Sequence, residues 1–384
     1  MRGKLVYPYT DKLLQYEFLK DHPLKPDRLK LTYLLSEQLG LIENVRQIET
    51  EPSPREELEL FHSPEFIDAV VNSPSSGADY KHGLGTMDNP IFPNMYDAAA
   101  RYVGATVDAM REIEKGASNA FVISGGLHHA HKSQASEFCI FNDVVVAVKY
   151  LQRKKPCKVL YLDILDAHHG DGVQNAFYNS KDVMTISMHQ SGKTLFPGTG
   201  HIHEIGASEG TGYSINIPVI PGASNEELIT ALDEVIVPLF ESFNPDLLVT
   251  QLGVDGHFLD PLAQLAYSTY GFEKVLVKLK DLASNICDIG WLAVGGGGYH
   301  PVNVARLWSL FLAIMLDEKV PDDIPEEFKE ICIERGYTKF PEGMRDEAAA
   351  EIVQQYYSKD DVRMDLERVI RRLKEMVFLY HGLS

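Results

Sequence analysis

Two kinds of apolar pattern alternate along the chain. Short runs rich in Val, Ile, Leu and Tyr, bounded by Gly, Asp or Pro, are typical of buried strands, and longer segments with apolar residues at every third or fourth position are typical of helices. The pattern predicts strands at residues 4–7, 120–124, 159–162, 183–189, 213–218, 247–252 and 291–294. It predicts helices at residues 29–40, 63–71, 96–115, 143–152, 173–178, 225–243, 272–287 and 301–316.

Strands that alternate with helices favour an α/β fold built on a parallel sheet. After residue 316 only helical patterns appear. We therefore expect one domain over residues 1–384, with an α/β core at 1–317 and a helical C-terminal extension at 318–384. Residues 72–85 are rich in Ser, Gly and Pro and predict a long surface loop.

Chemically unusual residues follow four of the predicted strands. The segment Asp163-Ile-Leu-Asp-Ala-His-His-Gly-Asp-Gly172 follows one of them, and Gly125-Gly-Leu-His-His129, Gly253-Val-Asp255 and Gly295-Gly-Gly-Gly-Tyr299 follow the others. In open parallel sheets, ligands bind outside the carboxyl ends of the strands. We therefore expect these four segments to converge on one site.

Asp166, His168 and Asp255 are the candidate metal ligands. Asp166 and His168 are two residues apart, so on a strand their side chains point to the same side. One imidazole and two carboxylates suit zinc or a similar divalent ion, and three protein ligands leave the open position of a catalytic site. Taken singly, polar residues at a strand end form turns or cap the next segment. Their expected convergence favours the metal site.

His128 and His129 follow two glycines and are the candidate acid and base. Two imidazoles beside a metal-activated water can exchange protons with it, and each needs an orienting carboxylate. Asp163 and Asp171 are available for that purpose. Tyr299 follows four glycines, whose flexible backbone lets a phenol approach a reacting centre and stabilise an oxyanion. The glycines lack the spacing of a phosphate-binding loop.

Composition and charge narrow the classes of function. The net charge of −19 argues against broad nucleic-acid binding and would steer a cationic substrate, although many soluble proteins are acidic. The four cysteines lack CxxC spacing, which predicts reduced thiols in the cytoplasm. The apolar run at 307–316 is too short to span a bilayer and no signal-peptide pattern is evident, so no membrane partner is expected. No role is predicted for His131, which is expected at the surface.

These motifs together resemble the zinc-dependent histone deacetylase family of the arginase/deacetylase superfamily. The resemblance runs in order from residue 4 to residue 316, and the chain is most similar to the prokaryotic acetoin-utilisation deacetylases. It implies a three-layer α/β/α fold around a mostly parallel sheet, and hydrolysis of N-acetyl-lysine, on proteins, to lysine and acetate. The segments that carry it are His22-Pro-Leu-Lys-Pro-Asp-Arg28, Gly125-Gly-Leu-His-His129, Ala135-Ser-Glu-Phe-Cys139, Asn142-Asp143, His168-His-Gly-Asp-Gly172, Phe196-Pro-Gly-Thr-Gly200 and Gly295-Gly-Gly-Gly-Tyr299.

The resemblance also implies catalytic roles for single residues. Asp166, His168 and Asp255 would hold zinc, or iron(II) in the cell. His129 would be the general base and His128 its electrostatic or acid partner. Asp171 would orient His129, Asp163 would orient His128, and Tyr299 would polarise the acetyl carbonyl.

Substrate and cation sites follow from the same resemblance. Phe138 and Phe196 would enclose the lysine stem, Leu262 would lie at the channel rim, Asp88 would hold the substrate backbone and Arg28 would line the acetate exit, with Glu137 and Gly297 as further substrate-binding residues. A structural K⁺ or Na⁺ would be held at one site by Asp163, Asp166, His168, Ser187 and Met188, and at a second by Phe177, Ser180, Val183 and Tyr213.

Two positions depart from the family pattern. The family motif is Asp-x-Asp-x-His, whereas here two residues separate Asp163 from Asp166. An extra residue reverses the side chains before it unless a bulge absorbs it, so the direction of Asp163 is the open question. Glu137 stands where the family usually has a glycine that lends its carbonyl to the substrate amide. Glu137 keeps that carbonyl and adds a carboxylate that crowds the channel or attracts a cationic substrate.

Two alternative functions remain open. An acetylpolyamine amidohydrolase is favoured by Glu137 and disfavoured by Leu262, because that activity is expected to need an acidic residue at the rim. A catalytically weakened acyl-lysine-binding protein is the other alternative, motivated by the inserted residue and by Glu137. An arginase-like dimanganese hydrolase is disfavoured because it needs more carboxylate ligands than these motifs offer.

Overall fold

A single parallel sheet forms the centre of the molecule. The computed structural model describes residues 4–341, 343–346 and 357–384. The strands in these ranges are β1 (Val6–Pro8), β2 (Arg46–Ile48), β3 (Asn119–Val122), β4 (Val159–Asp163), β5 (Val183–Gln190), β6 (Ser214–Val219), β7 (Leu247–Gln251) and β8 (Gly290–Val294). They form an 8-stranded sheet in the order β2-β1-β3-β8-β7-β4-β5-β6, and each neighbouring pair is parallel. The predicted α/β fold is confirmed.

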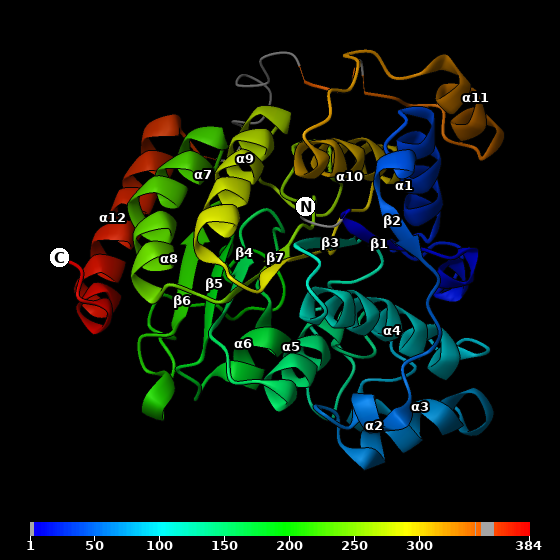
Figure 1. Ribbon diagram of the computed structural model, residues 1–384, viewed down its shortest axis with the longest axis horizontal. Helices are drawn as coiled ribbons and strands as arrows, with labels where there is room; N and C mark the ends of the chain where they lie inside the picture. Colours follow the sequence, from blue (N-terminus) through cyan, green and yellow to red (C-terminus); the bar gives the residue numbers. More distant parts are fainter. Residues whose placement is uncertain (1–3, 342, 347–356) are drawn as a thin grey trace.

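Helices cover both faces of this sheet. The α-helices in the described ranges are α1 (Asp27–Gln38), α2 (Arg55–Leu58), α3 (Pro64–Ser76), α4 (Met95–Glu114), α5 (Asp143–Lys154), α6 (Asp171–Phe177), α7 (Asn225–Ala231), α8 (Val237–Phe243), α9 (Thr269–Ile286), α10 (Pro301–Leu316), α11 (Glu326–Glu334) and α12 (Lys359–Val377). Figure 1 shows α4, α5 and α6 on one side of the sheet and α1, α7, α9 and α10 on the other. This is the three-layer arrangement that the family resemblance implies.

Burial explains why the central strands are continuous apolar runs. All residues of β4, β7 and β8 are buried, as expected for strands with helices on both faces. The predicted helix at 301–316 is confirmed as α10, which is almost wholly buried. Within the described residues, no helix is both long enough and apolar enough to cross a membrane.

The structure corrects two predicted elements and adds a third that was not predicted. The helix predicted at 225–243 is interrupted by a π-helical turn at Leu232–Ile236, just before Pro238, which has no N–H for a helical hydrogen bond. The predicted loop at 72–85 is wrong for residues 72–76, because α3 continues to Ser76 through Pro74. The edge strand β2 was not predicted, since its three residues are exposed or half-buried and two of them are polar.

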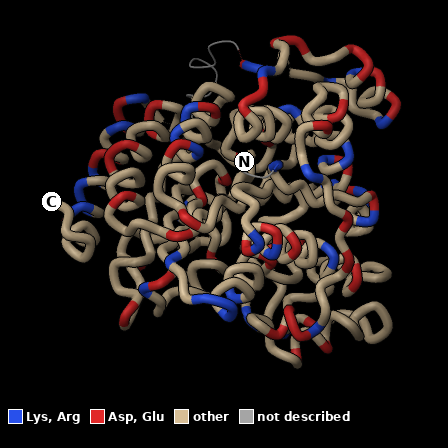
Figure 2. The backbone as a smooth tube through the Cα atoms, viewed as in Figure 1, with Lys and Arg blue, Asp and Glu red and all other residues tan. Residues whose placement is uncertain are grey.

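The acidic surplus is not gathered on one face in the view of the backbone. Figure 2 shows acidic and basic residues interspersed along the outer helices, including α11 and α12. Several of them pair with each other on one helix, as Arg368 does with Asp365 and Arg372 with Glu375. Such exposed pairs contribute little stability, and their main consequence is a mixed-charge surface.

One buried carboxylate ties the C-terminal extension to the core. Asp346 accepts hydrogen bonds from His257 Nε2 at 2.8 Å, from Arg306 Nη1 at 2.7 Å and from the Thr269 N–H at 2.9 Å. The side chains of His257 and Arg306 are 0% and 1% exposed. Because a buried guanidinium requires a counter-charge, Asp346 stabilises both α10 and the loop after β7.

Replacing Asp346 by Asn should therefore destabilise the fold. We expect the free energy of unfolding to fall by about 3–5 kcal/mol, as it does when one partner of a buried ion pair is removed. Urea denaturation followed by circular dichroism measures this. Asp322→Asn is the matched control, because Asp322 pairs with Arg345 in the same region but its side chain is 91% exposed. Equal effects of the two changes would contradict the role given to Asp346.

Candidate active site

Four loops at one edge of the sheet carry the candidate catalytic residues. His128 follows β3, His168 follows β4, Asp255 follows β7 and Tyr299 follows β8. These four strands are neighbours in the sheet, in the order β3-β8-β7-β4, and they are parallel. The convergence expected from the sequence is therefore a property of the strand order.

The three candidate metal ligands lie within reach of one ion. One ligand atom from each of Asp166, His168 and Asp255 lies within 4.8 Å of the others, and all three residues are buried. His168 Nδ1 is 2.7 Å from Asp255 Oδ2 and 3.6 Å from Asp166 Oδ1. The expectation that Asp166 and His168 lie on a strand is wrong, because β4 ends at Asp163. Instead, a loop turn brings them together, in which the His168 N–H donates to Asp166 Oδ1 at 3.0 Å.

Glycine backbone packs directly against the two carboxylates. A Cβ atom on Gly297 would lie 2.1 Å from Asp255 Oδ2, and one on Gly253 would lie 2.0 Å from Asp166 Oδ2. The Gly297 N–H donates to Asp166 Oδ2 at 2.8 Å. Gly297, expected to bind substrate, thus holds a candidate metal ligand in place.

The chemistry of this donor set fits a divalent cation. Burial, and then the negative charge of Asp166, raise the pKa of Asp255. Two buried carboxylates this close together repel each other, and a divalent cation between them and His168 would relieve that repulsion. Two carboxylate oxygens and one imidazole nitrogen are the ligand types that zinc accepts in catalytic sites.

The two histidines face each other, and each has its own carboxylate. His128 Nδ1 is 3.1 Å from Asp163 Oδ2, His129 Nδ1 is 2.8 Å from Asp171 Oδ1, and the two Nε2 atoms are 3.0 Å apart. Burial lowers the pKa of His128, but Asp166 and Asp163 outweigh it and raise that pKa to about 9. Burial, and then the charge of His128, lower the pKa of His129 to about 3. The pKa values of the two imidazoles are thus shifted in opposite directions, and His129 is the member of the pair that stays neutral.

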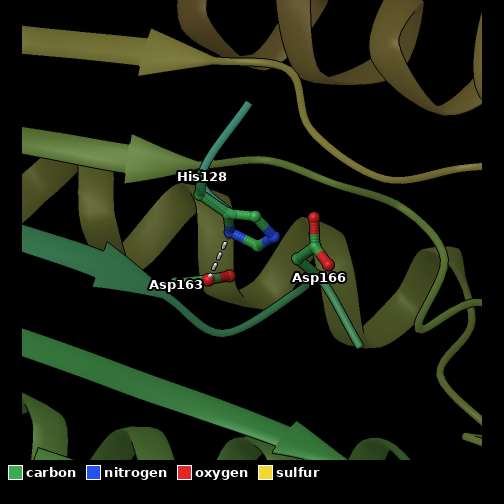
Figure 3. A group of neighbouring side chains, drawn as sticks. All are labelled: His128, Asp163 and Asp166. Atoms are coloured by element: carbon green, nitrogen blue, oxygen red, sulfur yellow. Dashed lines mark hydrogen bonds and ion pairs between the residues drawn. The ribbon is translucent and has the colours of Figure 1, made fainter. Parts of the chain in front are cut away.

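Asp163 points toward His128 despite the inserted residue (Figure 3). Strand β4 stays in register with β5 and β7 as far as Asp163, which is paired with Ser187 and Gln251. The extra residue is therefore absorbed in the loop after Asp163. The Oδ2 atom of Asp163 also accepts a hydrogen bond from the Tyr161 hydroxyl at 3.3 Å. Its Oδ1 atom is buried without a hydrogen-bond partner among the described residues.

Two phenylalanines flank the candidate catalytic groups. The Phe138 ring lies 5.7 Å from the Tyr299 ring, and the Phe196 ring lies 5.2 Å from the His129 ring. Phe138 is buried, whereas Phe196 is 38% exposed. One aromatic ring therefore lies beside the phenol and the other beside the histidine pair.

The other predicted substrate residues lie at different depths. Arg28 is buried, donates to the carbonyl of Gly296 at 2.6 Å, and lines a cavity together with the histidine pair and Tyr299. Asp88 is exposed, and its carbonyl accepts from His22 Nε2 at 3.1 Å. Leu262 is 38% exposed. The described residues that line the cavity are Leu24, Arg28, Gly126, Leu127, His128, His129, Glu137, Phe138, Cys139, Asp166, Gly296, Gly297 and Tyr299.

The predicted monovalent-cation residues fall into two backbone regions. Ser187 and Met188 lie on β5 beside Asp163. The second group surrounds the ends of α6, β5 and β6, where the carbonyl of Phe177 accepts from the Ser180 N–H and that of Tyr213 accepts from the Thr185 N–H. Val183, the fourth member of this group, begins β5.

The sequence analysis assigned no role to several residues that support the site. Asp143 accepts from the N–H groups of Gly126 and Leu127, at 3.0 and 2.8 Å, and so fixes the loop before the histidine pair. Gln251 Nε2 donates to Asp166 Oδ2 at 3.3 Å. Asp260 accepts from the Tyr299 N–H at 2.8 Å. Tyr161 lies two residues before Asp163 on β4, so its side chain points to the same side and the sequence could have indicated it. Gln251, at the end of β7, and Asp260 contact residues 85 and 39 positions away, which the local sequence pattern does not reveal.

His131 is not a free surface residue. It is half-buried, and its Nε2 lies 3.3 Å from Asp171 Oδ2, on the opposite oxygen from His129. The surface prediction for His131 is wrong because the loop after His129 turns back onto Asp171. Burial raises the pKa of Asp171, but the hydrogen bonds from His129 and His131 outweigh burial. The pKa is therefore lowered and Asp171 stays charged.

Known proteins share this chain's sequence and fold. Residues 22–315 match the family model of the histone deacetylase domain. The acetoin utilization protein AcuC of Bacillus subtilis (strain 168) is 36% identical over 338 residues, which cover 85% of this chain and 87% of that protein. AcuC of Staphylococcus xylosus is 36% identical over 329 residues, covering 84% and 85% of the two chains.

Solved structures agree with the sequence comparison. The crystal structure of an HDAC homologue from Aquifex aeolicus has a TM-score of 0.84 and 32% identity, and covers 96% of this chain and 100% of that one. An HDAC homologue complexed with SAHA has the same TM-score of 0.84, with 31% identity and the same coverage of 96% and 100%. With its arginase/deacetylase fold and its AcuC-like sequence, the chain belongs to the histone deacetylase family of hydrolases.

Proposed function

We propose that the protein hydrolyses N-acetyl-lysine to lysine and acetate with a divalent ion held by Asp166, His168 and Asp255. The observation that carries the proposal is the position of this ligand set beside two imidazoles that each have a carboxylate partner. A metal-binding set without an adjacent base would suit a structural site. A base and an acid at the same place suit attack by water on an acyl group.

His129, Tyr299 and His128 each have a separate role in the proposed reaction. A divalent ion, when bound here, lowers the pKa of water and polarises a carbonyl. His129, kept neutral by burial and by charged His128, accepts the proton of the attacking water. Tyr299, whose pKa is raised by burial and by Asp255 and Asp166, stays a phenol and donates a hydrogen bond to the acetyl oxygen. Charged His128, 3.0 Å from His129, supplies the proton for the leaving amine.

The same site suggests which cations the protein binds and which partners it acts on. The unpartnered Oδ1 atom of Asp163 supports a structural K⁺ or Na⁺ held by Asp163, Asp166, His168, Ser187 and Met188. We propose zinc or iron(II) as the catalytic ion, and acetylated lysine side chains of proteins or small molecules as the partners. The four cysteines are all buried free thiols, which supports a reducing cytoplasm as the compartment.

Metal removal and reconstitution test this proposal. The protein stripped with a chelator is expected to lose turnover of an acetyl-lysine peptide and to regain it with one equivalent of zinc or iron(II), because the ion activates the water. Calcium is the matched control, since it prefers more oxygen ligands than this site offers. Tight peptide binding without turnover in any metal form would favour the acyl-lysine-binding alternative and overturn the hydrolase proposal.

A second candidate substrate is an acetylated polyamine. The observation in its favour is Glu137, a carboxylate that lines the same cavity as His129 and Tyr299. Leu262, exposed and apolar, offers no acidic group to a distant ammonium. Comparing kcat/KM for an acetyl-lysine peptide and for acetylspermidine decides between the two substrates. If kcat/KM is clearly higher for acetylspermidine, the acetylated polyamine becomes the proposed substrate in place of acetyl-lysine.

A further inference from the structure

We infer that Glu137 is a supporting carboxylate of the metal site, which accepts the outer N–H of His168 and tightens metal binding. This inference rests on the proposed metal site. It assigns to Glu137 a positioning role toward a metal ligand, in place of the substrate contact expected from the sequence.

The backbone at Glu137 is strained for a residue with a side chain. Glu137 and Phe138 have φ angles of 32° and 64°. They are the two central residues of a tight turn, closed by reciprocal hydrogen bonds between Ser136 and Cys139 at 3.0 and 2.9 Å. Turns with positive φ at both central positions favour Gly, Asn or Asp. A glutamate held here calls for a functional reason.

The side chain of Glu137 turns into the catalytic cavity. It is 11% exposed, and its Oε1 atom lies 3.9 Å from His168 Nε2. It lines the cavity together with His128, His129 and Tyr299. Within residues 4–341, 343–346 and 357–384, no group donates a hydrogen bond to its carboxylate. The carboxylate is therefore available to a group in the cavity.

His168 needs an acceptor on the side that Glu137 faces. Its Nδ1 atom faces Asp255 and Asp166, so Nδ1 is the nitrogen that would bind the ion. Nε2 must then carry the proton, and metal-binding histidines almost always donate this outer N–H to a carboxylate, a carbonyl or water. Closing the 3.9 Å separation to hydrogen-bond distance takes a movement of about 1 Å, within the reach of a flexible glutamate side chain.

The expected consequence is a tighter metal site. Loss of an outer partner of a metal-binding histidine typically weakens metal affinity about 10–100-fold. A glycine, which the family resemblance leads one to expect at this position, would have no side chain to make this contact. The strained turn places the Glu137 carboxylate beside His168. The backbone strain is therefore tolerated because the side chain supports a metal ligand.

Metal affinity of the full-length protein tests the inference. The metal-free wild type, Glu137→Gln and Glu137→Gly are titrated with zinc against a competing chelator. We expect the zinc Kd to rise about 10–100-fold in Glu137→Gly, and by a smaller factor in Glu137→Gln, whose amide oxygen can still accept the N–H but carries no charge. We also expect Glu137→Gly, with the strain removed, to show a higher Tm than the wild type when metal-free. Asp317→Asn is the control: it removes an exposed carboxylate that pairs with Lys280, and it should change Kd less than about threefold.

The outcomes separate this inference from the proposed function. If the wild type binds zinc and both Glu137 variants bind it equally well, the inference is wrong while the metal site stands. A changed KM for acetyl-lysine with an unchanged zinc Kd would also overturn it, since Glu137 would then act on the substrate. If the wild type binds neither zinc nor iron(II), the proposed function fails and the inference fails with it.

Discussion

Asp255→Asn is expected to reduce deacetylation of an acetyl-lysine peptide by at least about a thousandfold. The change removes one of two negative ligands, and a catalytic metal supplies several kcal/mol of transition-state stabilisation, which corresponds to three or more orders of magnitude in rate. The fold should survive, because an amide oxygen can still accept the 2.6 Å hydrogen bond from the Ala167 N–H. Steady-state kinetics and the zinc content of the purified variant measure the effect.

The control for this variant is a carboxylate far from the site. Asp317 pairs with Lys280, and its side chain is 85% exposed, so Asp317→Asn should leave both rate and zinc content unchanged. An Asp255→Asn protein that retains zinc and more than about a tenth of wild-type kcat would remove Asp255 from the ligand set.

Tyr299→Phe is expected to lower kcat about 10²–10³-fold, the typical effect of losing one oxyanion donor. The phenylalanine keeps the ring that lies 5.7 Å from Phe138, so substrate binding should change little. Zinc affinity should stay at the wild-type value, because the phenol is not one of the three candidate ligands. Steady-state kinetics with matched zinc loading measures this separation of kcat from KM.

Tyr7→Phe is the matched control for the loss of a phenol. The Tyr7 hydroxyl is buried in β1 and has no hydrogen-bond partner among the described residues. Its removal should leave kcat unchanged. Near-normal turnover by Tyr299→Phe would take Tyr299 out of the mechanism, whatever the control shows.

The sheet and the meeting of its strand ends could be predicted because they depend on local pattern. The apolar runs of β4, β7 and β8 are buried on both faces, so their hydrophobicity marks them in the sequence. The edge strand β2 lacks that signal, because its residues are exposed or half-buried. Parallel strands then place their carboxyl ends at one edge, and this brings Asp166, His168 and Asp255 together.

The direction of Asp163 could not be predicted, because it depends on where the inserted residue is absorbed. A bulge inside β4 would have turned Asp163 away or kept it in place, depending on its position. The pairing of Asp163 with Ser187 and Gln251 puts the change in the loop instead. The contacts of Asp346 could not be predicted from the sequence either, because His257 lies 89 residues and Arg306 lies 40 residues away along the chain.

Anomalous scattering at the zinc edge, from crystals grown with zinc, tests the central claim most directly. The account predicts one strong peak about 2.0–2.2 Å from His168 Nδ1 and from carboxylate oxygens of Asp166 and Asp255. A further position on that ion should face His129 and Tyr299. Crystals that contain zinc but place no peak among these three side chains would contradict the account.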